Sequence, residues 1–216
     1  MDKKIAKVLA EYEARLEKEH KEMARTSPTE MGRRIDQLLL AVGPAVGQFL
    51  GALVKASGAK TILELGMSYG YSSIYLGEAA LATGGKVITT ELHPEKIAYA
   101  RKMHERAGLG GVVEIREGDA QDTLRAAKER FDFVLVDLWK DLYVPCLELF
   151  FPKLMPGAYV VADNMIYPPN TREDAKAYRA AVRAKPHMDS VLLPLGNGIE
   201  LSRYVAGLDA FGLLPS

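Results

Sequence analysis

Phe131-Asp132-Phe133-Val134-Leu135-Val136-Asp137-Leu138-Trp139-Lys140 joins a nearly continuous apolar run to charged residues at its end. The apolar run has the pattern of a strand that is buried on both faces, because a half-exposed strand would alternate polar and apolar residues. Open α/β sheets bind their ligands at the carboxyl ends of the strands. Asp137 and Lys140 are therefore candidates for chemistry, although a strand that simply ends in a solvated turn would have the same pattern.

The composition indicates one ordinary globular domain. The chain has 216 residues, of which 48% are hydrophobic and 26% are charged, and its formal net charge is zero. This length is sufficient for one large core. The balanced charge argues against a nucleic-acid partner, because proteins that bind phosphate backbones normally carry a basic face. Cys146 is the only cysteine, which excludes an intramolecular disulfide and fits a reducing compartment.

The N-terminal residues do not have the pattern of a targeting or membrane segment. Charges interrupt the first residues before an apolar signal region can form. The most hydrophobic stretch, residues 38–54, is interrupted by Gly43, Pro44 and Gly47 and is shorter than the roughly 20 apolar residues that a membrane span needs. We therefore expect a cytoplasmic protein that does not associate with a membrane.

The first 41 residues are predicted to be helical. An apolar stripe at three- and four-residue spacing predicts one amphipathic helix over residues 1–26, with the stripe made by Ile5, Val8, Leu9, Tyr12 and Leu16. The stripe must pack on the flank of the domain or on a second subunit, so a homodimer is one expectation. Ser27 is a candidate N-cap for a further helix through Leu40, and residues 47–56 resume the helical period after Gly43-Pro44.

From Thr61 onward, short apolar runs alternate with helical patterns. The predicted strands are 61–65, 86–90, 112–115, 131–136 and 158–162, and the predicted helices are about 72–82, 94–107, 120–129 and 141–154. This alternation is typical of a parallel sheet with right-handed crossovers. Two further runs around Gly196-Asn197-Gly198 predict a terminal hairpin. We therefore expect an α/β fold with a mainly parallel seven-stranded sheet, helices on both faces and a C-terminal antiparallel hairpin.

The loop after the first predicted strand has features of a ligand site. Gly66 and Gly70 permit a tight turn and a close approach of the backbone to a ligand, and Ser72 lies near a helix N-terminus, whose free N–H groups attract anions. Glu91 ends the next predicted strand and could accept both hydroxyls of a ribose. Asp119, after the third strand, could cap a helix or face the same crevice. Together, these consecutive loops favour an adenosine-type ligand.

Polar side chains also follow the fourth and fifth predicted strands. If these strands are neighbours about 4.8 Å apart, Asp137 and Asp163 emerge side by side, where they repel each other unless a cation or proton lies between them. Asn164 adds a neutral oxygen. Oxygen ligands of this kind suit a hard divalent cation such as Mg²⁺. The alternative is that Asp163 caps a turn and that Asn164 has a left-handed conformation.

With these motifs the chain resembles the class I S-adenosylmethionine-dependent O-methyltransferases. Within that class it resembles the small cation-dependent group of catechol and caffeoyl-CoA O-methyltransferases. The resemblance extends from about Val42 to the C-terminus. It is carried by Gly47-Gln48-Phe49-Leu50, Leu63-Glu64-Leu65-Gly66, Gly70-Tyr71-Ser72, Glu91, Asp137-Leu138-Trp139-Lys140-Asp141, Tyr143, Ala162-Asp163-Asn164 and Asn197-Gly198-Ile199. It implies a single Rossmann-like domain in which residues 42–216 form the cofactor-binding and catalytic core and residues 1–41 form an N-terminal lid or oligomerisation segment.

The resemblance also implies roles for individual residues. Asp137, Asp163 and Asn164 would bind Mg²⁺, and Lys140 would be the general base. S-adenosylmethionine would contact Val42, Glu64, Gly66, Ser72, Glu91, Ala120 and Asp137, with Trp139 against the adenine. Chelation of two vicinal hydroxyls would lower their pKa, and Lys140 could accept the proton. The implied reaction is methyl transfer to a hydroxyl of a catechol-type small aromatic diol.

Some residues depart from the catechol enzymes and leave the substrate open. Leu40 and Ala41 stand where those enzymes tend to place a methionine and a polar residue, Leu138 replaces a polar residue beside the cofactor, and residues 191–193 carry no carboxylate to meet the second hydroxyl. A metal-independent O-methyltransferase with the same fold is an alternative. A nicotinamide oxidoreductase is disfavoured because the chain lacks G-x-G-x-x-G at this loop. A non-catalytic binding protein is disfavoured by the intact Asp-Asp-Asn set with Lys140.

Overall fold

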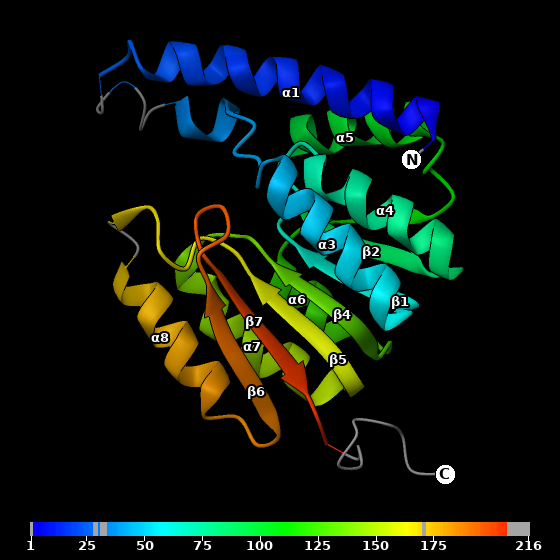
Figure 1. Cartoon of the computed structure of the whole chain (residues 1–216), viewed down its shortest axis with the longest axis vertical. Coiled ribbons are helices and arrows are strands. Elements are labelled where there is room, and N and C mark those ends of the chain that lie inside the picture. The colour runs from blue at the N-terminus through cyan, green and yellow to red at the C-terminus, as the bar shows by residue number, and fades with distance from the viewer. Residues whose placement is uncertain (1, 28–29, 31–33, 170–171, 207–216) are drawn as a thin grey trace.

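A computed structural model describes residues 2–27, 30, 34–169 and 172–206. These residues form one seven-stranded sheet in the order β3-β2-β1-β4-β5-β7-β6 (Figure 1). The first five strands are parallel, and they are β1 (Thr61–Leu65), β2 (Lys86–Glu91), β3 (Val113–Glu117), β4 (Phe131–Val136) and β5 (Leu154–Ala162). The last two, β6 (Met188–Leu193) and β7 (Ile199–Tyr204), pair antiparallel as a hairpin on β5. The predicted sheet and hairpin are confirmed.

Helices cover both faces of this sheet (Figure 1). One layer consists of α3 (Pro44–Ser57), α4 (Tyr71–Thr83) and α5 (Pro94–Ala107), with α1 (Lys3–Met23) lying across α4 and α5. The opposite layer consists of α6 (Ala120–Ala126), α7 (Tyr143–Phe150) and α8 (Arg172–Arg183). No helix among the described residues is long and apolar enough to cross a membrane.

The central strand β4 is apolar because both of its faces are covered. Phe133 and Leu135 belong to the core that includes α1, α3 and α4, whereas Val134 and Val136 belong to the core under α6, α7 and α8. All four side chains are fully buried. Successive residues of a strand point to opposite faces, so a strand between two helix layers needs apolar residues at every position.

The apolar stripe of α1 packs within the chain itself. Ile5, Val8, Leu9 and Tyr12 are buried in the same core as residues of α4 and α5. The sequence allowed the stripe to pack either on the domain's own flank or on a second subunit. In the structure it packs on the domain's own flank. A second subunit is therefore not needed to cover it.

The segment between α1 and α3 differs from the prediction. Ser27 Oγ accepts a hydrogen bond from Glu30 N at 3.3 Å, but much of the predicted helix start, residues 28–29 and 31–33, lies outside the described residues. Glu30 and Arg34 are helical, but the predicted extension of this helix through Leu40 is wrong, because the chain passes into the 3-10 turn η1 (Ile35–Gln37) and Leu38 is extended. Leu39 buries its side chain here, and tertiary contacts override the helical pattern.

Three boundaries on the far side of the sheet also differ. β5 begins at Leu154 rather than 158, because the strand continues through Pro156-Gly157 with a shift in its register against β4, as a bulge allows. α6 ends at Ala126 rather than 129. The predicted helix over 141–154 is α7 flanked by the 3-10 turns η2 (Lys140–Leu142) and η3 (Phe151–Lys153). The sequence did not identify α8, although Ala175, Tyr178 and Val182 recur at helical spacing and are buried.

Candidate active site

The strand order brings the predicted site residues to one edge of the sheet. Leu65 pairs with Val136, and Val136 pairs with Ala162, so the next residues of β1, β4 and β5 lie side by side. Asp137 N donates to Leu65 O at 2.9 Å, and Asp163 N donates to Val136 O at 3.1 Å. The ladder therefore continues one residue past each strand before the loops diverge.

Gly66 is needed where the loops after β1 and β4 meet. Its φ is +91°, and a Cβ at this position would lie 2.2 Å from Asp137 O. A side chain would therefore meet backbone atoms that cannot move without displacing the β4 loop. The tight turn predicted at Gly66 is present, and the backbone that it approaches most closely is that of Asp137.

The acidic pair at the ends of β4 and β5 is poorly compensated. Asp163 is buried, and its Oδ1 has no hydrogen-bond partner among the residues that the structure describes. Burial raises the pKa of Asp137, and the nearby Asp163 carboxylate raises it further; burial also raises the pKa of Asp163. Asn164 has a φ of +57°, so the left-handed conformation considered for it is present. That conformation does not exclude a ligand role for its side chain.

Lys140 lies against the same cluster. Its Nζ donates to Asn164 Oδ1 at 3.0 Å, to Leu138 O at 3.3 Å and to the hydroxyl of Tyr143. Burial lowers the pKa of Lys140, while the carboxylates of Asp137 and Asp163 act in the opposite direction. Burial of the amine favours the neutral form that a base requires.

Tyr143 is a member of the cluster that sequence reasoning did not give a role. It is fully buried at the start of α7, its ring centroid lies 4.1 Å from Lys140 Nζ, and its hydroxyl donates to Asp163 O at 3.2 Å. The hydroxyl therefore connects Lys140 to the backbone of β5. The three-residue spacing from Lys140 to Tyr143 on a helical turn was the available signal.

The cofactor side of the site contains a second buried carboxylate with a different environment. Glu64 on β1 is fully buried and accepts hydrogen bonds from the hydroxyls of Ser72, Ser73 and Thr89. These donors lie on α4 and β2, so Glu64 fixes the start of α4 against the sheet. The side-chain oxygens of Glu64 and Ser72 bond to each other in this network. Contact of these two residues with a cofactor stays a prediction.

Glu91 is held in place at the end of β2. Its Oε2 accepts from Ser68 N at 2.8 Å, and its Oε1 accepts from Leu92 N at 2.8 Å and from His93 N at 2.9 Å. The carboxylate thus faces the glycine loop, as the ribose role requires. That role stays a prediction.

The other predicted contact residues lie along the same edge. Asp119 caps α6 by accepting from Gln121 N at 2.8 Å, which is the structural alternative considered for it, and Ala120 follows as the first helical residue. Trp139 is 51% exposed and can meet a flat ligand. Val42 precedes α3 and packs against the core that includes residues of α1, α3 and α4.

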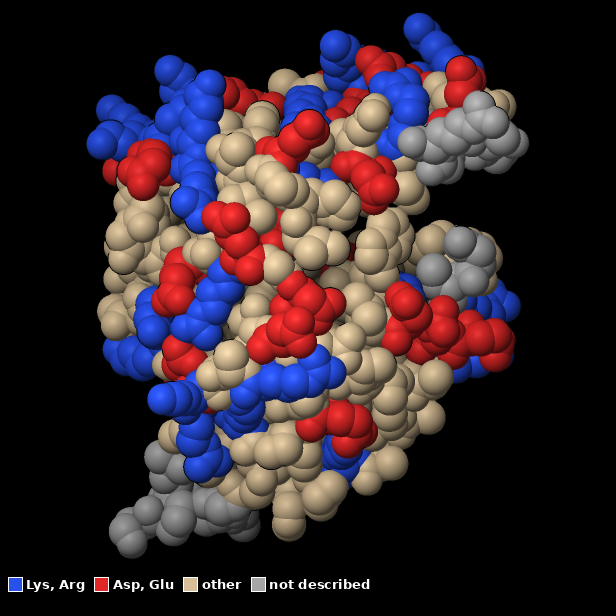
Figure 2. Space-filling view, turned by 180° about the vertical axis from the view of Figure 1, so that it is seen from behind, with Lys and Arg blue, Asp and Glu red and all other residues tan. Residues whose placement is uncertain are grey.

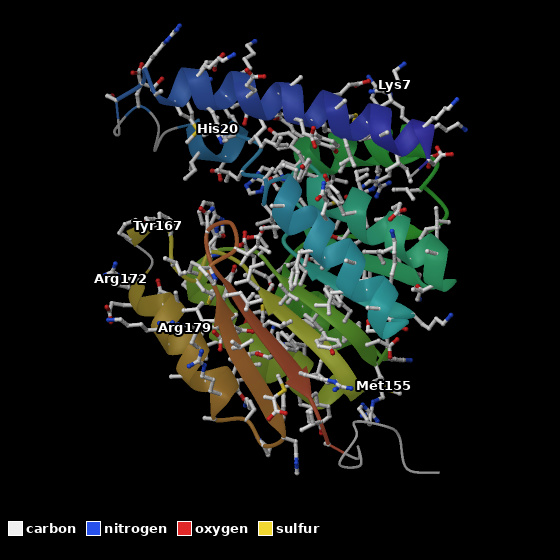
Figure 3. All side chains as sticks on the ribbon, viewed as in Figure 1. Lys7, His20, Met155, Tyr167, Arg172 and Arg179 are labelled. Atoms are coloured by element: carbon white, nitrogen blue, oxygen red, sulfur yellow. The ribbon has the colours of Figure 1, made fainter. Side chains whose placement is uncertain are left out.

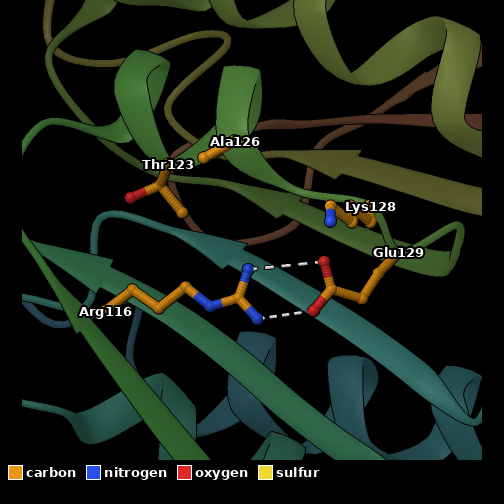
Figure 4. A pocket seen from close by; sticks show the side chains of 5 residues that line it. All are labelled: Arg116, Thr123, Ala126, Lys128 and Glu129. Atoms are coloured by element: carbon orange, nitrogen blue, oxygen red, sulfur yellow. Dashed lines mark hydrogen bonds and ion pairs between the residues drawn. The ribbon is translucent and has the colours of Figure 1, made fainter.

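Two pockets of about 390 and 380 Å³ lie away from this edge. The first lies beside Arg116 and Glu129, whose side chains form an ion pair (Figure 4). The second lies at the amino ends of the strands, between Lys60, Asp132 and Gly157. Neither contains a predicted site residue. The surface is also hollowed on the side where α1 ends and α8 begins (Figure 2), and Tyr167 lies on that side, below α1 (Figure 3).

The donor set fits a hard cation. Asp137 and Asp163 offer carboxylate oxygens, and Asn164 offers an amide oxygen. Asp163 Oδ1 is an acceptor that finds no donor in the described part of the chain. No cluster of three or more His, Cys, Asp or Glu side chains suited to a metal occurs among the described residues. The predicted set has only two such side chains, so it depends on the amide and on further oxygens from water or substrate.

Comparisons with known proteins point to one family. A family model described as O-methyltransferase matches residues 14–205. The chain is 33% identical over 169 residues to a catechol O-methyltransferase of Niastella koreensis, which covers 72% of this chain and 76% of the relative. It is 29% identical over 189 residues to a caffeoyl-CoA O-methyltransferase of Petroselinum crispum, covering 78% of each. An O-methyltransferase from Bacillus cereus in complex with SAH superposes with a TM-score of 0.73 at 26% identity, covering 94% of this chain and 91% of the other.

The contact at Gly66 predicts a matched pair of stability effects. Gly66→Ala adds both the cost of a positive φ and a clash with backbone, so we expect it to lower the free energy of unfolding by about 2–4 kcal/mol. Gly58→Ala is the control, since Gly58 has a φ of +67° but nothing within 4 Å of its Cβ position. That variant should lose about 1 kcal/mol. Equal losses in urea unfolding would contradict the proposed backbone contact.

Proposed function

This chain belongs to the O-methyltransferase family, and on that premise we propose that it methylates one hydroxyl of a vicinal diphenol in a Mg²⁺-dependent reaction. The family and the relatives supply the class of reaction and S-adenosylmethionine as the methyl donor. The substrate, the metal and the base are the proposed part. The observation that carries them is the meeting of Lys140 Nζ, Asn164 Oδ1 and the buried Asp163 at one point.

In this proposal Lys140 is the general base. Its Nζ is fixed by Asn164 and Tyr143, and burial lowers its pKa, so a neutral amine can accept a proton from the substrate hydroxyl. Asp137, Asp163 and Asn164 would hold Mg²⁺. The ion supplies Lewis acidity, which lowers the pKa of a catechol hydroxyl.

The methyl transfer balances without a further reactant. The phenolate oxygen forms a bond to the methyl carbon, the bond between that carbon and the sulfonium sulfur breaks, and its electron pair returns to sulfur. The proton from the hydroxyl resides on Lys140 Nζ. Since no other group must move, the remaining contribution of the protein is to align the two partners. Gly66, Glu91 and Trp139 would hold the donor in that alignment.

An uncharged rim favours a neutral acceptor. Residues 38–43, 164–169 and 191–198 contain no Asp, Glu, Lys, Arg or His. Two of these segments are joined, because Ile166 N and Tyr167 N donate to Asn197 O at 2.9 and 3.0 Å. Gly196 brings the hairpin against α3, with its Cβ position 2.6 Å from Val46 Cγ2. Apart from Lys140 and the proposed Mg²⁺ at Asn164, a carboxylate or polyphosphate entering between these segments would find no cation within them to pair with.

A homodimer and a cytoplasmic location stay predictions. The stripe of α1 is buried within the chain, so a dimer would have to use other surfaces. On the face seen in Figure 2, acidic and basic side chains are interspersed. Mass measurement in solution at micromolar concentration tests the dimer.

A methyl-transfer assay with 4-methylcatechol tests the proposed function. We expect activity with Mg²⁺, loss of activity with EDTA, and recovery when Mg²⁺ is added in excess of the chelator, because the hydroxyl otherwise keeps its high pKa. SAH (S-adenosylhomocysteine) binding, measured by calorimetry, should survive chelation. Activity that EDTA leaves unchanged would reject the metal and favour the metal-independent alternative.

Replacing the base tests its role. We expect Lys140→Met to lower kcat by about 10²-fold or more, the usual size of a lost acid–base contribution, with little change in SAH affinity. Lys185→Met is the control, because Lys185 pairs with Glu148 at 2.6 Å and lies outside the site. Unchanged kcat in Lys140→Met at neutral pH would remove Lys140 from the mechanism.

A substrate series tests the uncharged rim. We expect kcat/KM for 4-methylcatechol to exceed that for 3,4-dihydroxybenzoate by about ten-fold or more, because the carboxylate would enter uncharged surroundings. Caffeoyl-CoA should be poorer than 4-methylcatechol for the same reason. A value for caffeoyl-CoA that equals or exceeds the value for 4-methylcatechol would contradict this assignment.

A further inference from the structure

The side of α1 that faces the domain carries polar residues as well as its apolar stripe. Tyr12 is fully buried and Glu19 is 9% exposed, although α1 is a charged surface helix. A buried carboxylate and hydroxyl are costly unless they are paired. We name Tyr12, Arg15 and Glu19 the α1 latch, because each of them contacts the segments that lie between α1 and the predicted cofactor site.

Glu19 holds the extended segment that follows η1. Its Oε2 accepts from Leu39 N at 2.8 Å, and its Oε1 accepts from Arg15 Nε at 2.7 Å. Arg15 in turn donates to Gln37 O at 3.1 Å. Residues 38–42 belong to no helix or strand, so their backbone groups need partners from elsewhere in the chain. Glu19 supplies one of these partners across 20 residues of sequence.

Leu39 passes this restraint to the glycine loop. Its carbonyl oxygen accepts from Ser68 Oγ at 3.3 Å, so the two backbone groups of Leu39 are bound by α1 on one side and by the glycine loop on the other. The side chain of Leu39 is buried in the core that includes residues of α1, α3 and α4. A shift of Leu39 would therefore reach Ser68.

Tyr12 and Arg15 contact the glycine loop directly. The Tyr12 hydroxyl donates to Tyr69 O at 2.6 Å. The guanidinium of Arg15 lies 4.0 Å from the centroid of the Tyr69 ring, within the range of a cation–π interaction. Two side chains one helical turn apart thus hold the backbone and the ring of one loop residue.

On its opposite side the glycine loop contacts Glu91, the residue that is predicted to bind the ribose. Ser68 N donates to Glu91 Oε2 at 2.8 Å. Ser68 also has a φ of +50°, a conformation that is unfavourable for a non-glycine residue and that persists only when its surroundings hold it. The surroundings that hold it are Leu39, Tyr69 and Glu91.

We propose that the α1 latch positions the glycine loop and Glu91 for S-adenosylmethionine, so that α1 contributes to cofactor affinity without touching the cofactor. The latch residues are positioning residues, since each acts through Leu39, Tyr69 or Ser68. The proposal rests on the proposed function, because it places the cofactor at this loop. It assigns to the N-terminal helix a role in binding the methyl donor.

Two conservative variants test the latch by calorimetry with SAH. Tyr12→Phe removes one hydroxyl and keeps the ring, whose centroid lies 5.6 Å from that of Tyr71. Glu19→Gln keeps the size of the side chain and removes its charge. We expect either variant to raise the Kd for SAH about three- to ten-fold, the effect of one lost hydrogen bond. The KM for S-adenosylmethionine should rise similarly while kcat at saturating cofactor is unchanged.

Glu17→Gln is the matched control. Glu17 lies on the same helix and pairs with Lys21 four residues away at 2.6 Å, but both side chains are exposed. This variant should keep wild-type SAH affinity. Hydrogen exchange at the amides of residues 66–70 gives a second readout, and it should be faster in Tyr12→Phe than in wild type and Glu17→Gln.

The outcomes separate the latch from the proposed function. If wild-type protein binds SAH and Glu91→Gln weakens binding, while Tyr12→Phe and Glu19→Gln keep wild-type Kd and lose only melting temperature, the latch is overturned and α1 is merely structural. If wild-type protein does not bind SAH, the proposed function fails and the latch fails with it. If Glu19→Gln does not fold, the Kd of Tyr12→Phe decides alone.

Discussion

Parallel pairing of β4 with β5 forces two carboxylates together, and the chemistry of the site depends on this constraint. The register that pairs Val136 with Ala162 leaves Asp137 and Asp163 no freedom to separate, since both strands are packed on both faces. Two like charges that are held on neighbouring strands and shielded from water repel each other, so the state in which both are ionised is destabilised. The chain compensates them only in part, through the amine of Lys140 and backbone N–H groups. The proposed Mg²⁺ would supply the compensation that Asp163 Oδ1 lacks among the described residues.

Glu64 and Asp163 are both buried carboxylates, but the fold supplies hydrogen-bond donors to one of them far more fully than to the other. Both are buried at the same edge of the sheet. Glu64 accepts hydrogen bonds from three hydroxyls, which tie β1 to β2 and α4. Asp163 keeps an oxygen that has no partner among the described residues, and such an oxygen calls for a water, an ion or a substrate atom. Burial alone would not distinguish the two, and the number of donors does.

The sequence predicted the sheet because its signal was local. The apolar run before Asp137 requires two covered faces, and the glycine at position 66 requires a special turn. Both features are independent of the rest of the chain. The Asp-Asp-Asn set with Lys140 followed once neighbouring strands were assumed. What could not be predicted depended on distant contacts. Leu39 lies in a stretch with a helical pattern, but its backbone N–H and C=O groups form hydrogen bonds with Glu19 and Ser68 instead. Tyr143 gained a role only because the η2 turn brings its hydroxyl to Lys140 Nζ.

The polar residues of α1 illustrate why such contacts are missed. Helical periodicity is judged by apolar residues, and by that measure the stripe consists of Ile5, Val8, Leu9, Tyr12 and Leu16. The same face of the helix also includes positions 15 and 19, where the chain has Arg15 and Glu19. Charged residues at the buried positions of an amphipathic helix are expensive, so each indicates a specific partner that a solvated face would not need. Here the partners lie on the extended segment and on the glycine loop. This connects a helix that looks like an outer cover to the edge of the sheet where the methyl donor is expected to bind.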